Sequence, residues 1–308
     1  MRRTLRSAVT FRGVGLHGGH SAMARVRPAH AGHGIAFLRT DVAAGTGLIP
    51  ARYDLVSDTR LCTKLSNGSG VSVATVEHVM AALAGCGITD ALVEIDGPEV
   101  PILDGSSLPF VRGMRRSGAK SLAGPLKAIQ ILSPVEVIDQ GRVARFVPSD
   151  MPELAFTIRF ADTAIGEQNA EVTLVEDAFS SELAECRTFC MLSDVEALRT
   201  VGLAQGGGLE NAIVVDEGRV LNPEGLRRSD EFVRHKMLDA VGDIALAGAP
   251  IVGRYEGELA GHEMNNKLVC KLFARPDAWT WVDADPRHLP SIRSVAELGE
   301  RRAVTIAV

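Results

Sequence analysis

The chain has 308 residues, a hydrophobic content of 46% and a net charge of -5. This length predicts two domains, and the acidic balance argues against a protein that holds nucleic acid or an anionic bilayer through charge. No segment approaches the roughly 20 apolar residues of a membrane span, and MRRTLRSAVTF lacks the apolar stretch of a signal peptide, so we expect a cytoplasmic protein without an integral membrane segment.

The cysteines are odd in number and show no paired CxxC spacing, which argues against a disulfide framework and against a cysteine-rich zinc site. We expect reduced thiols at Cys62, Cys86, Cys186, Cys190 and Cys270. A nucleophilic Cys62 would need a partnered base and a lowered pKa, neither of which the sequence shows. We interpret it as a buried or cleft-lining thiol.

Residues 5 to 40 alternate between short strand-like runs and turns rich in Gly or Pro, which predicts an antiparallel meander. Glycines 13, 15 and 18 form a GxGxxG motif, but the apolar and polar residues of the following GGHSAMARVRP alternate as in a strand, and the run ends at a proline. A dinucleotide-binding turn would need a helix there, so we predict a hairpin. His20, His30 and His33 could bind metal, but we interpret them as exposed loop residues. A further strand is predicted at LCTKL, 61 to 65.

From Thr75 the apolar period becomes helical in TVEHVMAALAG, with Thr75 as the expected N-cap and Gly85 past the end. ALVEID follows as a strand, and VPILDGSSLPFVRGM as a loop feeding a second helix. Residues 117 to 125 have the composition of a linker. We therefore predict an N-terminal α+β domain at 1–120 and a C-terminal α+β domain at 126–308.

The second half repeats the pattern of the first. GRVARFVPSDMPELAFTIRFAD echoes HSAMARVRPAHAGHGIAFLRTD, and RHKMLDAVG aligns with EHVMAALAG so that His235 lies over His78 and Gly242 over Gly85. Two similar α+β halves, each with a helix carrying a His, could bring both histidines to one cleft. GGGLENAIVVD lacks the GK[ST] ending of a P-loop, and we interpret it as a turn into a strand.

The helix expected around 231–243 carries a second, polar face. His235, Asp239 and Asp243 are spaced by four and form one ridge, separate from an apolar stripe that includes Val233 and Met237. The ridge is either the solvated side of the helix or part of a metal site. A catalytic zinc takes three protein ligands and leaves one position open; here the third would be His78, at a helix N-terminus that favours a neutral ring.

Glu77 and His262 are the candidates for proton transfer. A carboxylate next to a ligand histidine can serve as general base toward a metal-activated water, although Glu77-His78 is also compatible with the start of a surface helix. His262, in GELAGHEMNNKLV, could protonate a departing amine, with Asp243 nearby to raise its pKa.

Five runs of sequence resemble a known family. GVGLHGG, TVEHVMAALAGCGITDALVEIDGPEVPILDGSSLPFV, CRTFCML, EFVRHKMLDAVGD and GHEMNNKL are similar, in order and over nearly the whole chain, to the bacterial UDP-3-O-acyl-N-acetylglucosamine deacetylases. The resemblance implies removal of the N-acetyl group at the committed step of lipid A biosynthesis in Gram-negative bacteria. It also implies two α+β domains packed as a β-α-α-β sandwich with the helices inside, and a small insert in each domain, around 41–66 and 190–214.

The same resemblance implies roles for individual residues. The zinc ligands, for which iron is a possible substitute, would be His78, His235 and Asp239. Glu77 would be the general base, and His262 the general acid, oriented and charged by Asp243. The hydroxyl that helps to stabilise the oxyanion would belong to Thr188. Phe189 would lie near the sugar and acyl chain, and Lys236 would contact the substrate at its phosphates. The substrate cleft would be lined by His17, Leu16, Leu61 and Cys62.

The second insert would form the passage for the fatty chain through Val195, Leu198, Val201 and Leu203, although ordinary packing explains these residues equally well. The expected partner is a small molecule, a UDP-acyl-glucosamine derivative, and not nucleic acid; we expect a monomer. A catalytically inactive homologue that only binds this ligand, with a structural or absent metal, is the alternative. Structural zinc sites are closed by four protein ligands, so three ligands with a base and an acid favour the enzyme.

Overall fold

The structure, a computed structural model, describes residues 1–290. The strands and helices of the first half are β1 (Arg3–Leu5), β2 (Val9–Val14), β3 (Ser21–Pro28), β4 (Ile35–Arg39), β5 (Leu48–Pro50), η1 (Tyr53–Leu55), β6 (Val56–Asp58), β7 (Lys64–Ser66), β8 (Ser72–Val73), α1 (Glu77–Gly85), β9 (Ala91–Ile95), α2 (Leu108–Ser117) and β10 (Ala119–Ser121).

The second half contains β11 (Lys127–Ile131), β12 (Val135–Asp139), β13 (Arg142–Val147), β14 (Pro152–Arg159), β15 (Glu167–Thr173), η2 (Phe179–Leu183), β16 (Phe189–Met191), α3 (Leu192–Thr200), β17 (Ile213–Asp216), β18 (Arg219–Val220), α4 (Glu231–Ala245), β19 (Ile251–Glu258), α5 (His262–Phe273), β20 (Trp279–Asp283) and η3 (Pro286–His288). Among the helices of this described part, none has the length and hydropathy needed to cross a membrane.

The two halves use the same strand arrangement. In the first sheet the order is β2-β3-β9-β4-β5, with β9 antiparallel to β3 and parallel to β4. In the second sheet β19, which follows α4 as β9 follows α1, lies between antiparallel β13 and parallel β14, flanked by β12 and β15. The second sheet also contains β11, which pairs with the first residues of β19, and β20 beside it. The repeat seen in the sequence is therefore a repeat of topology, and the expected α+β class is confirmed.

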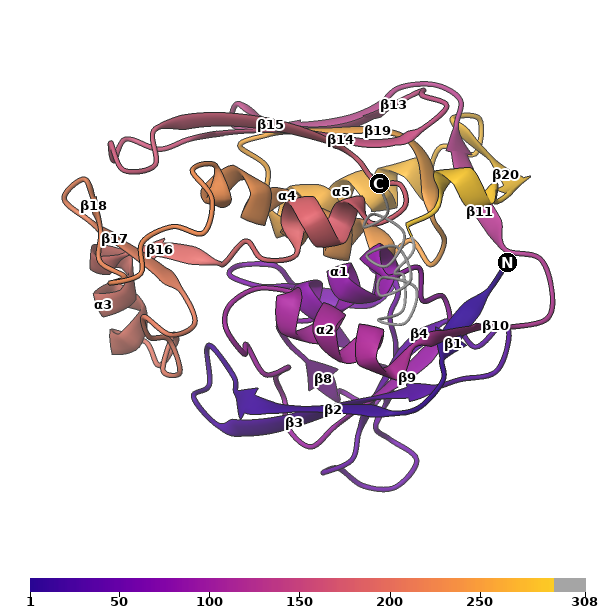
Figure 1. Cartoon of the computed structure of the whole chain (residues 1–308), viewed down its shortest axis with the longest axis horizontal. Helices are drawn as coiled ribbons and strands as arrows, with labels where there is room; N and C mark the ends of the chain where they lie inside the picture. The colour runs from indigo at the N-terminus through magenta and orange to yellow at the C-terminus, as the bar shows by residue number, and fades with distance from the viewer. Residues whose placement is uncertain (291–308) are drawn as a thin grey trace, which may run out of the picture.

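Helices fill the space between the sheets. Figure 1 shows α1 and α2 over the first sheet and α4 and α5 under the second, so that the layers run β-α-α-β. The strands bury alternate residues toward these helices, as period-two patterning requires; β14, for example, buries Leu154, Phe156 and Ile158. The helices at the centre, α1 and α4, are buried on nearly every side.

Glycine lets the central helices approach their neighbours closely. A Cβ at Gly242 of α4 would lie 2.1 Å from the carbonyl oxygen of Glu77 at the start of α1. A Cβ at the aligned Gly85 of α1 would lie 2.1 Å from the ring of Phe179. Both aligned glycines thus permit contacts that any side chain would block.

Each half carries a small extra sheet. Strands β6, β7 and β8 form one, and β16, β17 and β18 form the other, next to α3. The second falls where the insert at 190–214 was expected and projects from the side of the molecule (Figure 1). The first begins later than the predicted 41–66, because β5 belongs to the main sheet, paired with β4.

Other local predictions need correction. Thr75 does not cap α1: the N-cap is Val76, without a side-chain cap, and the Thr75 hydroxyl donates to Glu99 instead. Only Lys64 and Leu65 of the predicted strand LCTKL are in β7. The predicted linker contains β10, which pairs with β1 of the N-terminus. The GxGxxG segment does form the predicted β2-β3 hairpin.

Candidate active site

Three side chains from the two central helices converge on one point. His235 Nε2 lies 3.4 Å from Asp239 Oδ1, and His78 Nε2 lies 3.6 Å from the same oxygen. All three residues are at most 4% exposed. Within residues 1–290 this is the one group of three or more His, Cys, Asp or Glu side chains whose ligand atoms could share a metal ion. The alternative of a solvated ridge on α4 is therefore wrong.

The surroundings of this group fit a cation. Asp239 Oδ1, which both imidazoles approach, is buried and accepts no hydrogen bond, an arrangement that is costly for a carboxylate oxygen unless a cation satisfies it. Burial lowers the pKa of His235 to about 3, so its ring is neutral, as a metal ligand must be. His235 Nδ1 lies 3.1 Å from the carbonyl oxygen of Cys186; donation there leaves the Nε2 lone pair facing the group.

Glu77 lies beside the three converging residues, at the first position of α1. The residue is 3% exposed, and its Oε2 accepts a hydrogen bond of 3.0 Å from the backbone N–H of Thr63. Burial raises the pKa of Glu77. The structure thus places here a carboxylate that is more basic than usual and fixed at one oxygen, and the interpretation of Glu77-His78 as the start of a surface helix is wrong.

Asp243 and His262 form a second buried pair. His262 Nδ1 lies 2.9 Å from Asp243 Oδ2, and the same carboxylate accepts from Asn265 Nδ2 at 2.8 Å and from the Thr63 hydroxyl at 2.5 Å. Burial by itself lowers the pKa of His262, but the Asp243 carboxylate outweighs it and raises the pKa to about 9. A protonated imidazole is therefore maintained with Nε2 4.0 Å from Asp239 Oδ2.

Lys236 points toward the same centre. Its Nζ lies 2.6 Å from Asp239 Oδ2, and although burial lowers the pKa of Lys236, the Asp239 carboxylate outweighs this effect and raises it. The ammonium is thus held on the oxygen of Asp239 that does not face the two histidines.

The CRTF segment, residues 186–189, belongs to the second half of the chain and lies next to His235. The Phe189 and His235 rings are 6.2 Å apart. The Thr188 N–H donates to the Gly105 carbonyl at 2.8 Å, and its own carbonyl accepts from Ile213 at 2.8 Å. The preceding Arg187 is buried and donates to Glu231 Oε1 from both its backbone N, at 3.0 Å, and its Nε, at 2.9 Å. This segment is therefore anchored to the first turn of α4.

The remaining predicted cleft residues lie on two loops of the first half. His17 and Leu16 belong to the β2-β3 turn, and both ring nitrogens of His17 are buried without a hydrogen-bond partner. Leu61 is 41% exposed and Cys62 is half-buried. Burial raises the pKa of Cys62 to about 12, which agrees with its interpretation as an unreactive thiol.

The sequence did not point to several supporting residues. Thr63, Glu99 and Glu231 hold groups of the site in place, and the Ser107 hydroxyl donates to the His78 carbonyl at 2.8 Å. Asn265 was within reach of sequence reasoning, since it follows His262 by three and shares its helix face. Glu231 was also within reach, since it precedes His235 by four on α4. Thr63, Glu99 and Ser107 touch the site through contacts between separate segments, which leave no spacing signal.

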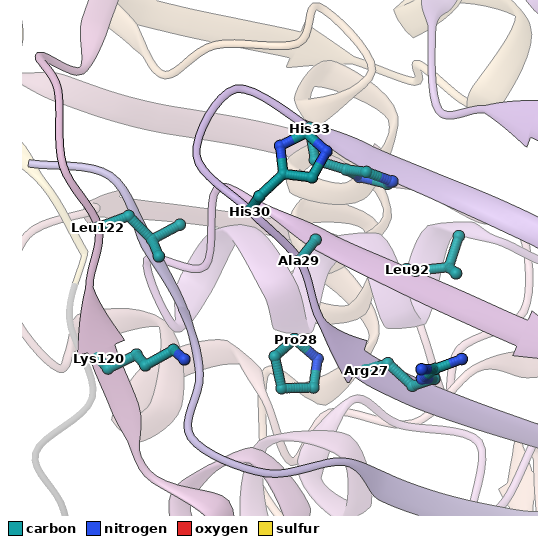
Figure 2. A pocket seen from close by; sticks show the side chains of 8 residues that line it. All are labelled: Arg27, Pro28, Ala29, His30, His33, Leu92, Lys120 and Leu122. Carbon is teal, nitrogen blue, oxygen red and sulfur yellow. The ribbon is translucent and has the colours of Figure 1, made fainter.

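The surface histidines do not form a comparable group. His20 and His30 are exposed and His33 is half-buried. Figure 2 shows His30 and His33 at a shallow pocket also lined by Arg27 and Lys120. Each Nδ1 of this pair lies near a neighbouring backbone oxygen, Ala31 for His30 and Gly34 for His33. The prediction of exposed loop residues is therefore confirmed for His20 and His30, whereas His33 is half-buried.

Comparisons with known proteins agree with the sequence resemblance. A family model described as UDP-3-O-acyl N-acetylglycosamine deacetylase matches residues 2–274. The UDP-3-O-acyl-N-acetylglucosamine deacetylase of Phenylobacterium zucineum (strain HLK1) is 53% identical over 278 residues, which cover 90% of this chain and 95% of the relative. Proteins of the same name from Anaeromyxobacter dehalogenans (strain 2CP-C) and Geobacter sp. (strain M21) are 49% and 43% identical, covering 90% and 93% of this chain and 89% and 93% of theirs.

Proposed function

The chain belongs to the UDP-3-O-acyl N-acetylglycosamine deacetylase family, and from this membership we propose that it hydrolyses the acetamide of a UDP-3-O-(3-hydroxyacyl)-N-acetylglucosamine and releases acetate, in lipid A biosynthesis. The observation that carries the proposal is the convergence of two buried imidazoles and one buried carboxylate, in the neighbourhood of a second carboxylate, Glu77, and a second imidazole, His262, whose pKa values are both raised. We further propose that the enzyme acts in the cytoplasm, as a monomer.

His78, His235 and Asp239 would hold the metal, zinc or possibly iron. When bound, such an ion supplies Lewis-acid polarisation of the amide carbonyl and makes water more acidic. The three ligands come from both halves: His78 from the domain we place at 1–120, and His235 and Asp239 from the domain we place at 126–308.

Glu77 takes the proton of the attacking water. A general base works best when its pKa lies near the working pH, and burial shifts the pKa of Glu77 in that direction. The Thr63 N–H occupies Oε2, which leaves Oε1 as the oxygen that receives the proton.

His262 delivers a proton to the departing amine. An amine leaves poorly unless it is protonated, and the Asp243 carboxylate keeps His262 charged while fixing Nδ1 as the nitrogen that faces away from the site. Nε2 then carries the proton that is transferred. Asn265 and Thr63 hold Asp243 in the required orientation.

The Thr188 hydroxyl donates a hydrogen bond to the developing oxyanion, a role for which a fixed donor is best suited. Its backbone is held on both sides by Gly105 and Ile213. Phe189, Lys236, Leu16, His17, Leu61 and Cys62 contact the sugar, acyl chain and phosphates. Val195, Leu198 and Leu203, half-buried around α3, line the acyl passage together with Val201, which is 70% exposed.

The test is a deacetylation assay on the purified protein with and without a chelator, together with metal analysis. We expect about one zinc or iron per chain, turnover that is lost with the metal, and recovery when Zn²⁺ or Fe²⁺ is restored. Binding of the UDP-sugar without any turnover would support the alternative, a catalytically inactive homologue. Turnover that survives complete metal removal would refute the metal-dependent reaction.

A further inference from the structure

Thr75, two residues before Glu77, has a backbone conformation that calls for an explanation. Its φ is 57°, in the left-handed region that β-branched residues seldom adopt, and it is 2% exposed. Its hydroxyl donates to Glu99 Oε1 at 3.0 Å. A strained, buried residue next to a catalytic group persists only when its surroundings hold it there, and the partner that holds Thr75 is Glu99.

Glu99 also holds a second segment of the site. Its Oε1 accepts from the backbone N–H of His17, and its Oε2 from the backbone N–H of Gly18, both at 2.9 Å. Glu99 is 7% exposed, and the three groups that donate to its carboxylate are all neutral. Hydrogen bonds to an ionised acceptor are among the stronger ones, so this buried carboxylate ties the β2-β3 turn to the residues that precede α1.

The turn is built around this carboxylate. A Cβ at Gly15 would lie 2.4 Å from Glu99 Oε2, so the glycine leaves room for the carboxylate that binds the turn. On its other side the turn meets the second half of the molecule: the carbonyl oxygens of Leu16 and His17 accept from Gly206 at 3.0 Å and Gln205 at 3.1 Å. Between these two attachments the turn carries the half-buried His17, whose two ring nitrogens are buried without a hydrogen-bond partner.

We propose that Glu99 is a positioning residue for the deacetylation, which holds the segment 15–19 and Thr75 in one arrangement so that His17 and Glu77 meet the same substrate. This proposal rests on the proposed function. Glu99 itself does not touch the reacting atoms; it acts through the backbone of His17 on substrate binding and through Thr75 on the approach of Glu77.

The first experiment is Glu99→Gln in the full-length, metal-loaded enzyme. A side-chain amide has only one oxygen, so its NH₂ must face either the Gly18 N–H or the His17 and Thr75 donors. The glutamine therefore cannot accept all three hydrogen bonds that Glu99 accepts. We expect kcat/KM to fall by about 10- to 100-fold, with a raised KM as well as a lowered kcat, at unchanged metal content. Amide hydrogen exchange in segment 15–19 should accelerate. The control is Glu94→Gln on β9, where the carboxylate pairs with Arg25 and Arg27; it should leave all these quantities unchanged.

Variants of Thr75 and His17 separate positioning from general stability. Thr75→Ser keeps the donor and should retain activity, whereas the isosteric Thr75→Val should lose it. In a double-mutant cycle, Glu99→Gln should cost much less in kcat/KM when His17 is already Ala, because the two act together.

The outcomes are distinguishable. An inactive wild-type protein would refute the proposed function itself. With an active wild type, normal kinetics and normal amide exchange in Glu99→Gln would refute the positioning role. So would full additivity of Glu99→Gln and His17→Ala in kcat/KM. A loss of activity that merely matches the fraction of unfolded protein, with wild-type kcat and KM in the folded fraction, would also refute it.

Discussion

At the residue scale, burial and neighbouring charge together set the protonation state of each titratable group in the site. Burial is the largest effect on the pKa of His235 and keeps its ring neutral despite the neighbouring Asp239, whereas the Asp243 carboxylate overrides burial and keeps His262 charged. Two histidines of one site therefore hold opposite protonation states near neutral pH. In the proposed reaction the same residue type would therefore serve as a ligand at His235 and as a proton donor at His262, where the Asp243 carboxylate lies 2.9 Å from Nδ1.

The assignment of Glu77 as base and not ligand predicts the behaviour of Glu77→Ala. Turnover should fall by about 100- to 10,000-fold, since general-base catalysis is removed, while the metal content stays at the wild-type level because none of the three converging atoms is altered. Metal analysis and single-turnover kinetics on the same preparation check both parts. His235→Ala is the comparison in which metal should be lost; loss of metal from Glu77→Ala would mean that the carboxylate is a ligand.

Much of the site could be predicted from sequence because its reactive residues lie in short motifs. His235, Asp239 and Asp243 are spaced by four on one helix, and Glu77 adjoins His78. Their supports could not be predicted in the same way. Thr63 reaches Asp243 across 180 positions of the chain, and Glu99 reaches His17 across 82, so only the fold brings these partners together.

At the element scale, the close packing of α1 against α4 brings the two histidines together. Gly242→Ala should separate these helices, because the new Cβ would overlap the Glu77 carbonyl. We expect a loss of about 2 kcal/mol or more in the free energy of unfolding, typical of overpacking, together with weaker metal retention. Urea denaturation and metal analysis measure the two effects. Gly97→Ala, where a Cβ meets no atom within 4 Å, is the matched control, and equal behaviour of the two variants would contradict this role of Gly242.

The start of α4 is tied to the CRTF segment by a buried ion pair. Glu231 is fully buried, and its carboxylate accepts from Arg187 and from the backbone of Arg227. Glu231→Gln removes the buried partner of the Arg187 guanidinium and leaves it only the more exposed carboxylate of Glu224; breaking a buried pair costs about 3 to 5 kcal/mol. Denaturant titration checks this value. Glu167→Gln removes the exposed partner of Arg159 and should cost less than about 1 kcal/mol; a similarly small cost for Glu231→Gln would show that the pair contributes little.

Periodicity was informative for the elements that are amphipathic or strongly repeated. The helices α1 and α4 and the strands β3, β4 and β9 lie where the pattern placed them. The prediction for Thr75 failed because a tertiary contact decided the local structure: the hydroxyl expected to cap α1 donates to Glu99. Within LCTKL, Thr63 lies outside β7 and donates to Glu77 and Asp243 instead. The β10 strand in the predicted linker likewise exists only because β1 pairs with it.

At the scale of the whole molecule, two copies of one topology face each other through their helices (Figure 1). The repeat was visible in the sequence as paired helices with aligned His and Gly residues, and it indicated that both histidines could meet in one cleft. The ion would therefore bridge α1 and α4. Neither half alone contains the full set of ligands, base and acid.

The most direct test of this claim is anomalous diffraction at the zinc and iron absorption edges from crystals of the metal-loaded protein. The account predicts one strong peak between α1 and α4, within about 2.0 to 2.2 Å of a nitrogen of His78, a nitrogen of His235 and an oxygen of Asp239. A loaded, active protein whose metal peak lies elsewhere, or whose ligands do not include all three of these residues, would contradict it.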